Sequence, residues 1–195
     1  MWLRERLAVA SRAREVLEEK LEALNRELHE VRGRLAEDQE AWQQALETAE
    51  RLLRSAELIG GVEQTERVVA LISEATVAVE FGRTLGVPHP TSAAVTSPDG
   101  VATPWAHTSR VHRAGTAYRD ALRAGARYAT TRRALDILEG EYRRTSRRLR
   151  SIERRWIPAL EAQLRTSARA LDEAEREDSV RISWVASGRG AEGAR

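Results

Sequence analysis

Histidines are the residues whose chemistry stands out first, because three of the four lie close together in the chain, at His89, His107 and His112. Imidazole nitrogens are common metal ligands, so three of them near Asp99 raise the question of a metal site. The spacing argues against one, since His107 and His112 are five residues apart and the chain has no cysteine. We therefore expect solvent-exposed loop histidines here and no bound metal.

Carboxylates are the other groups that could do chemistry, as general acids or bases. Glu18 and Glu19, and the run LDEAERED (Leu171 to Asp178), stand where an exposed helix face needs charge, so a solvated surface explains them. The chain has no phosphate-cradling glycine-rich loop before a lysine and no strand-nucleophile-helix turn. The sequence predicts no catalytic activity and no cofactor of its own.

Composition points to long helices as the elements that carry these residues. Charged residues make up 32% of the 195 residues and aromatic residues only 5%, a profile typical of long amphipathic helices rather than of a thick core. No apolar stretch is long enough for a membrane span or resembles a signal peptide. We expect no membrane insertion and a cytoplasmic setting.

Arginine provides all the basic side chains except Lys20. Guanidinium groups fit phosphate well, which would suit nucleic-acid binding. The arginines are spread evenly instead of forming one patch, so we interpret them as the result of coding bias and expect no nucleic-acid partner.

Residues 1–60 show an alternating three-and-four spacing that is typical of a coiled-coil helix. Only Arg14 and Asp38 interrupt the apolar positions of this seam. Gly60 and Gly61 are expected to end the helix. The seam consists of Leu3, Leu7, Ala10, Arg14, Leu17, Leu21, Leu24, Leu28, Val31, Leu35, Asp38, Trp42, Ala45, Ala49, Leu52, Ala56 and Ile59.

Residues 61–115 form a middle segment of different character. Its first part, Val62 to Glu80, reads as a short helix that passes into the extended stretch TVAVEF. Residues 82–109 hold four of the five prolines and read as a loop. Within it, the turn signature SPDG (Ser97 to Gly100), flanked by SAAV and VAT, predicts a small β-hairpin.

Residues 116–185 form a second seam, strict in its spacing up to Trp156 and then stretched to successive fours around Pro158, which favours the straighter geometry of an eleven-residue repeat. A proline inside a helix costs about 3 kcal/mol, because it removes a donor and crowds the carbonyl four residues back, that of Arg154. Either Pro158 bends the helix beside Trp156, or it is tolerated on the outer face with its freed carbonyl hydrated. The seam consists of Leu135, Leu138, Tyr142, Thr145, Leu149, Ile152, Trp156, Leu160, Leu164, Ser167, Leu171 and Ala174. Residues 186–195 are expected to be a disordered tail.

The two long helices are expected to pair, since a single narrow seam does not stabilise a helix alone in water. Residues 1–85 carry 12 basic and 17 acidic side chains, and residues 110–195 carry 20 and 12, so opposite charges favour pairing within one chain. The predicted fold is all-α, a long antiparallel two-helix coiled coil of the N- and C-terminal helices with a small middle segment. We expect Leu28 near Leu160 and Leu24 near Leu164.

The C-terminal helix carries a signature: Glu141, T-x-R-R (Thr145, Arg147, Arg148), Leu149, I-E (Ile152, Glu153), I-P (Ile157, Pro158), L-x-x-x-E-R-E-D (Leu171, Glu175, Arg176, Glu177, Asp178) and R-I (Arg181, Ile182). The N-terminal arm adds R-L-x-x-A-x-R-A-x-x-x-L-E-E-K (Arg6 to Lys20), and the middle adds G-V-P (Gly86 to Pro88). In these motifs the chain resembles the D subunit of the V-type and A-type rotary ATPases, over most of residues 3–185.

The resemblance implies a non-catalytic central rotor stalk that transmits torque between the catalytic head and the membrane ion-translocating ring. It implies as partners the catalytic A and B subunits, the F subunit and the subunit that joins the membrane ring, at the cytoplasmic face of the membrane. It also implies a partner interface or a shaft-shaping role for Arg147, Arg148, Glu153, Trp156, Ile157, Pro158, Glu175, Arg176 and Arg181.

Two other functions explain parts of the sequence. An unrelated coiled-coil scaffold or adaptor would account for the heptads and would make the I-P motif a coincidence. An arginine-rich helical nucleic-acid binder would show binding that falls steeply with salt.

Overall fold

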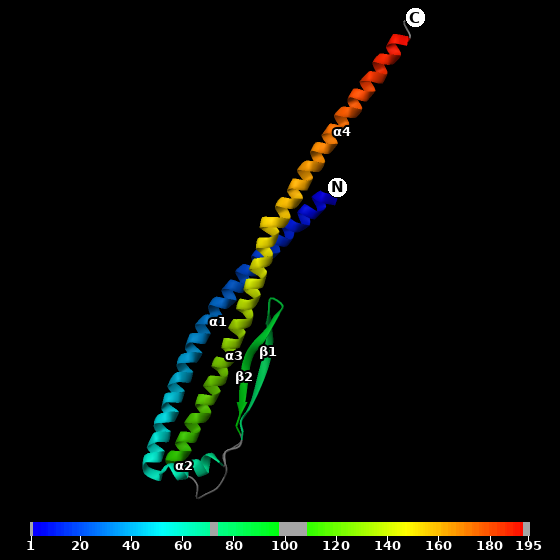
Figure 1. Ribbon diagram of the computed structural model, residues 1–195. Coiled ribbons are helices and arrows are strands. Elements are labelled where there is room, and N and C mark those ends of the chain that lie inside the picture. The colour runs from blue at the N-terminus through cyan, green and yellow to red at the C-terminus, as the bar shows by residue number, and fades with distance from the viewer. Residues whose placement is uncertain (1, 71–73, 98–108, 193–195) are drawn as a thin grey trace. The chain divides into compact units, whose positions relative to one another are not determined.

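The computed structural model describes residues 2–70, 74–97 and 109–192, with side chains as far as Trp184. Its helices are α1 (Trp2–Gly60), α2 (Val62–Val69), α3 (Ser109–Ser151) and α4 (Ile157–Glu192), and a short π-helix, η1 (Ile152–Trp156), connects the last two. Two strands, β1 (Thr76–Thr84) and β2 (Val87–Thr96), follow α2 (Figure 1). The prediction of an all-α chain with two long helices and a small hairpin is confirmed.

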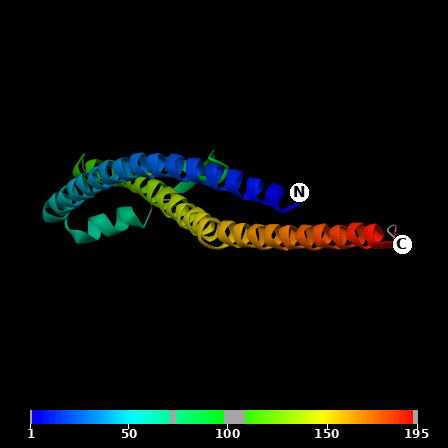
Figure 2. The same ribbon diagram turned by 90° about the horizontal axis from the view of Figure 1, so that it is seen from above.

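The chain divides into two compact units, one of residues 21–144 and one of residues 1–20 with 145–195. In the first, α1 and α3 lie side by side and run in opposite directions (Figures 1 and 2). Their contacts show the antiparallel order, because a higher number on α1 meets a lower number on α3. Arg32 pairs with Glu139, Asp38 with Thr131, Trp42 with Tyr128 and Ser55 with Arg110.

The core of residues 21–144 lies only partly in the predicted seams, because Ala114, Ala121, Ala124 and Ala134 precede the predicted start of the second seam at Leu135. Leu24, Leu28 and Val31 of α1 pack with Leu135 and Leu138 of α3, and all five are buried. Further along the pair, the buried seam residues are mostly alanines, at positions 49, 56, 114, 121, 124 and 134. Small side chains let the two backbones approach closely, so the core is narrow and most of the surface stays polar.

The expected register is wrong. Leu24 and Leu28 pack against Leu135 and Leu138, not against Leu164 and Leu160. Apolar residues recur at every third or fourth position of both seams, so helices slipped by several turns still bring apolar residues together. Specific pairs of unlike size and polarity decide between these alternatives.

One such pair is a large ring opposite a glycine. Trp42 of α1 stacks on Tyr128 of α3, with ring centroids 5.2 Å apart and planes 14° from parallel. A Cβ at Gly125 would lie 3.0 Å from Trp42 Nε1, so the indole occupies the space that a side chain would need. This fit allows one axial position for Trp42 on α3.

The polar interruption at Asp38 is a second such pair. The Thr131 hydroxyl of α3 donates a hydrogen bond of 2.7 Å to Asp38 Oδ2, and both side chains are half-buried. A partly buried carboxylate in an apolar seam is costly unless it is hydrogen-bonded. Asp38 is therefore a polar contact that favours this register over those that would leave it unpaired.

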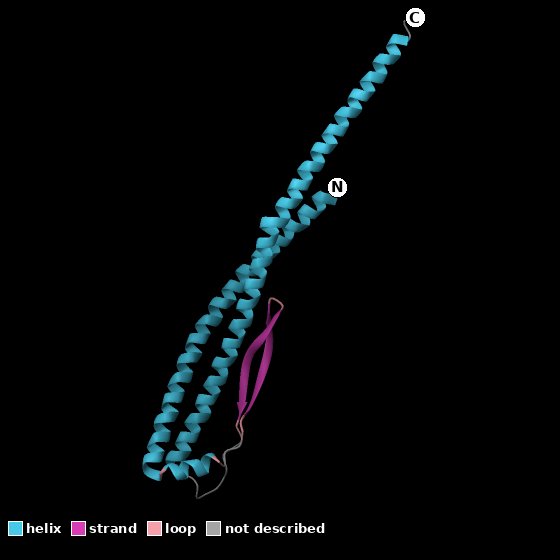
Figure 3. Ribbon diagram, viewed as in Figure 1, coloured by secondary structure: helices cyan, strands magenta, loops and turns pink. Residues whose placement is uncertain are grey.

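The hairpin forms elsewhere than predicted. Strands β1 and β2 pair antiparallel through the two-residue turn Leu85–Gly86 (Figure 3), where φ is +52° and +79°. Positive φ at both central residues matches the twist of hairpin strands. The expected turn at Ser97–Gly100 lies largely outside the described residues, as does VAT, while SAAV belongs to β2 and pairs upstream with β1.

The prolines explain why residues 82–96 looked like a loop. Pro88 and Pro90 lie in β2. Among the described residues β2 pairs with β1 alone, so its other edge is unpaired, and prolines, which lack an N–H donor, are tolerated in such a strand. The register shifts between Glu80 and Phe81, next to Pro90, which marks a β-bulge. At the turn end, Val87 enters the core of the helix pair.

The ends of the helices follow partly from the sequence. As predicted, α1 ends at Gly60, and Gly61 has a φ of +79° and donates its N–H to Glu57 O at 2.9 Å. Helix α3 begins earlier than expected, at Ser109 rather than Thr116. The expected disordered tail is wrong for residues 186–192, where α4 continues to Glu192, because extending an existing helix costs far less than starting one.

Gly125→Val should destabilise the chain. The new Cβ and methyl groups would clash with the Trp42 indole, and overpacking of this kind costs about 1–3 kcal/mol. Urea unfolding followed by circular dichroism would show the lowered midpoint. Gly115→Val is the matched control, since a Cβ there meets only Arg119 Nη2 at 4.0 Å. An equal midpoint for both variants would contradict the fit of Trp42 on Gly125.

Candidate functional site

The nine residues expected at an interface all belong to the unit of residues 1–20 and 145–195. Arg147 and Arg148 end α3 with exposed side chains, Glu153 and Trp156 lie in η1, and Ile157 begins α4. Pro158, Glu175, Arg176 and Arg181 follow on α4, all exposed. They occupy one helical axis, and about 1.5 Å of rise per residue puts Arg181 roughly 35 Å from Pro158. The structure therefore does not bring them into one site.

The first group, around Trp156, does meet the N-terminal arm. The Arg6 guanidinium lies 4.7 Å from the ring centroid of Trp2 and 5.9 Å from that of Trp156. A guanidinium within about 6 Å of an indole face is attracted by the negative face of the ring. Arg6 thus joins the first turn of α1 to η1, while both indoles remain partly exposed.

The π-helix η1 accommodates Pro158. The Ile157 N–H donates to Ile152 O, five residues back instead of four. Ile152 and Leu160 are both buried, yet eight residues of a regular α-helix would turn Leu160 about 80° away from Ile152. The wide turn rotates less per residue and so removes this excess rotation, just where a proline cannot make the α-helical bond to Arg154 O.

The stretched spacing around Pro158 therefore has another cause than the predicted eleven-residue geometry. A single π-turn inserts one extra residue, which gives the successive fours. Pro158 and Arg154 are both exposed, so Pro158 lies on the outer face of the helix. Whether it bends the helix or is merely tolerated there stays a prediction.

The second group lies on the outer part of α4. Arg176 pairs with Glu173 at 3.2 Å and Arg181 with Asp178 at 3.6 Å, within the helix. The Ser179 hydroxyl donates to the Glu175 carbonyl oxygen at 2.8 Å. These are exposed pairs, each worth at most about 1 kcal/mol, and they leave the remaining carboxylates of this stretch on the surface.

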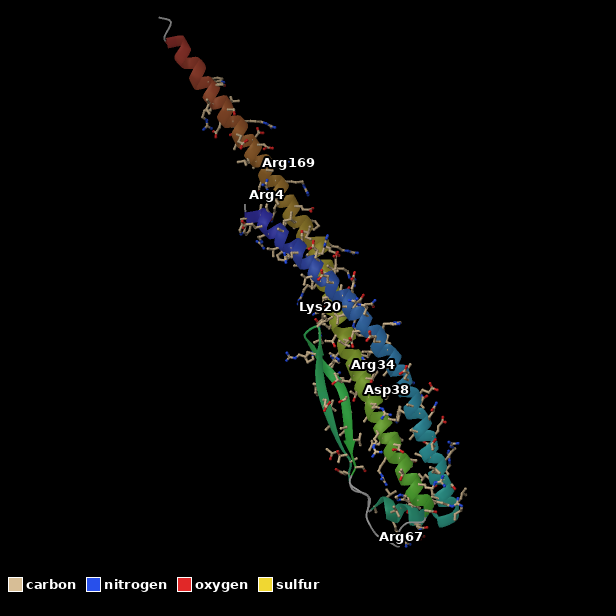
Figure 4. The ribbon with its side chains drawn as sticks, turned by 180° about the vertical axis from the view of Figure 1, so that it is seen from behind. Arg4, Lys20, Arg34, Asp38, Arg67 and Arg169 are labelled. Atoms are coloured by element: carbon tan, nitrogen blue, oxygen red, sulfur yellow. The ribbon has the colours of Figure 1, made fainter. Side chains whose placement is uncertain are left out.

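The apolar residues of this outer part are the feature that sequence reasoning missed. Leu171 was assigned to the paired seam, but its side chain is 60% exposed, and Val180, Ile182 and Trp184 are exposed as well. From residue 165 to Trp184 every described side chain of α4 is exposed. Figure 2 shows α4 continuing past the N-terminal end of α1, and in Figure 4 Arg169 lies beyond Arg4. The sequence contained this information, because the apolar seam of the C-terminal helix extends past the point where the N-terminal helix can cover it.

The histidines take no part in this surface. His89 is buried in β2, with Nδ1 3.2 Å from Val87 O, so the expectation of an exposed loop histidine is wrong there. His112 is exposed on α3, and His107 lies outside the described residues. Among the residues that the structure describes, no group of three or more His, Cys, Asp or Glu side chains could hold a metal ion. In the same part of the chain no helix is long and apolar enough to cross a membrane.

Comparison with known proteins decides the family. The family model that describes the D subunit of ATP synthase matches residues 1–187. The chain belongs to the ATP synthase D-subunit family. It is 30% identical over 191 residues to the V-type ATP synthase D subunit of Anaeromyxobacter dehalogenans, covering 92% of this chain and 88% of that protein. It is 29% identical over 187 residues to the A-type ATP synthase D subunit of Methanopyrus kandleri, covering 94% and 81%.

Membership of the D-subunit family confirms the resemblance read from the T-x-R-R and I-P motifs. It makes the chain a component of a multisubunit ATPase complex. The exposed stretch of α4 carries large apolar side chains, which on protein surfaces often mark interaction sites.

Arg6→Gln should loosen the N-terminal arm of this D-subunit chain. Loss of the cation removes two ring contacts of about 0.5–1 kcal/mol each, so proteolysis near residues 2–12 should quicken and Trp emission should shift. Arg4→Gln, two residues away and exposed, is the control. Identical digestion of the two variants would show that the Trp2–Arg6–Trp156 contact does not hold the arm.

Proposed function

We propose that the chain is the non-catalytic central-stalk subunit of a V/A-type ATPase, which transmits torque between the catalytic A/B head and the membrane ion-translocating ring. The observation that carries this proposal is the outer part of α4, residues 165–184, which is helical and exposed on all sides in a chain of the D-subunit family. A stalk must enter a head that surrounds it. A helix with apolar side chains on several faces suits a binding site that contacts it from several directions.

The charges of this stretch limit what it can pair with. Asp172, Glu173, Glu175, Glu177 and Asp178 are clustered around the single basic residue Arg176, with Arg165 and Arg169 before the cluster and Arg181 after it. In an antiparallel pairing with a second copy centred on this cluster, acidic residues would face acidic residues and Arg169 would face Arg181. Like charges at such positions disfavour association. A binding site formed by other subunits, lined by their apolar and basic side chains, avoids this repulsion.

Torque transmission follows from asymmetry. The catalytic interfaces of the head meet different faces of α4, and each contact stabilises one conformation of its interface by a different amount. A rotor changes nucleotide affinity only through such differences in contact free energy. The chain then needs no catalytic group, and ATP synthesis or ATP-driven ion transport depends on its shape and surface. The F subunit and the subunit joining the membrane ring are the partners expected for the middle and lower parts, with the complex at the cytoplasmic face.

Co-expression with the A, B and F subunits tests the proposal. We expect the chain to enter the complex in fixed stoichiometry. We expect the triple variant Leu171→Ser, Ile182→Ser and Trp184→Ser to lose affinity for the A/B head by about a thousandfold or more, because buried apolar side chains contribute about 1.5–3 kcal/mol each. Phe81→Ser is the control, since Phe81 is 70% exposed on β1. A chain that stays out of the complex would favour the scaffold hypothesis, and retention on nucleic acid that falls with salt would favour the binder.

Pro158→Ala should weaken coupling in the assembled complex. Alanine restores the N–H and removes the ring, so η1 can return to α-helical register and turn the outer part of α4 relative to Thr145–Ser151. We expect normal assembly but fewer ions transported per ATP hydrolysed. Pro88→Ala, at an exposed proline of β2, controls for the substitution. Unchanged coupling would mean that Pro158 is merely tolerated.

A further inference from the structure

Two glycines lie at the same level of the helix pair formed by residues 21–144. Gly33 is inside α1 and Gly140 is inside α3, far from the ends of both helices. The residues that precede them meet across the pair, where Arg32 Nη2 donates to Glu139 Oε1 at 2.8 Å. Each helix therefore has a glycine at this level.

Packing does not require either glycine. A Cβ built at Gly33 or at Gly140 meets no heavy atom within 4 Å outside the local helix backbone. Gly125 differs, because there the Trp42 indole fills the space. Glycine inside a helix is unfavourable relative to alanine, since its backbone has more freedom to lose. Both helices are thus weakened at one level without any gain in contact.

The flanking charges compensate for this weakness. Gly33 stands between Arg32 and Arg34, and Gly140 between Glu139 and Glu141. Arg32 pairs with Glu139 across the helices, while Arg34 pairs with Glu27 and Glu141 with Arg144 within their own helices. Arg143 Nη1 also lies 3.9 Å from Glu139 Oε2. Long, flexible side chains can keep such a contact while the backbones beneath them move. Val31 and Leu138, buried beside this level, keep the apolar seam continuous.

We propose that Gly33 and Gly140 form a paired hinge, at which α1 and α3 open or bend together while the Arg32–Glu139 ion pair keeps them associated. Glycines are among the few recognised causes of helix bending, and local opening occurs where helix stability is lowest. The hinge is a property of residues 21–144 themselves and does not depend on the proposed rotor function.

Hydrogen exchange on the full chain tests the hinge. Amides of residues 30–36 and 137–143 exchange faster than those of the flanking turns, through local opening. Gly33→Ala slows exchange about fivefold in its own segment, the factor that corresponds to the difference between glycine and alanine in a helix. Because the two helices open together, Gly33→Ala also slows residues 137–143, and Gly140→Ala slows residues 30–36.

Gly115→Ala is the matched control, because it improves α3 at another level and its Cβ approaches only Arg119 Nη2 at 4.0 Å. It leaves exchange in both segments unchanged. Exchange no faster than in the flanking turns, effects confined to the substituted helix, or equal slowing by Gly115→Ala would each overturn the hinge. A fourth result would also overturn the hinge. If the double variant Gly33→Ala, Gly140→Ala kept unchanged exchange but lost the co-purifying A, B or F subunits, the glycines would serve to make room for a partner's backbone.

Discussion

A helix that is apolar along one narrow stripe is not stable alone in water, and both long helices of this chain are of that kind. The chain solves this by folding back, so that in residues 21–144 each stripe covers the other. The buried side chains are few, and many are alanines. Single contacts such as Trp42 on Gly125 therefore matter, because there is no thick core to compensate for their loss.

The helices could be predicted because the period of a seam is visible in one sequence. The register could not, since leucines seven residues apart look alike after a slip, and the deciding pairs, Asp38 with Thr131 and Trp42 with Gly125, lie about 90 residues apart in the chain. The hairpin was misplaced because Leu85 at a φ of +52° lacks the usual turn chemistry, whereas Ser97–Gly100 has it. The prolines of β2 were misread for the related reason that a strand with a free edge tolerates them.

The candidate interface was predictable as a set of residues but not as a geometry. The motif around Pro158 marked the right part of the helix, and the stretched spacing there recorded an extra residue. Only coordinates distinguish a π-turn from the geometry of an eleven-residue repeat, because both give successive spacings of four in the sequence. The exposure of α4 depends on where α1 begins opposite it. The incorrect register prediction paired α1 with more of α4 than it covers, so this exposure was not predicted.

The outer part of α4 has a consequence for the life of the protein before assembly. Newly made chains display Leu171, Ile182 and Trp184 to water, and bare apolar helices are what chaperones and proteases bind. If the A/B head covers these side chains, as proposed, chains made in excess of that head keep them exposed, and loss of the surplus by aggregation or degradation is the expected result. On the proposed function, the survival of each copy would then depend on its incorporation into the complex, and the abundance of the chain would follow the supply of the subunits that cover it.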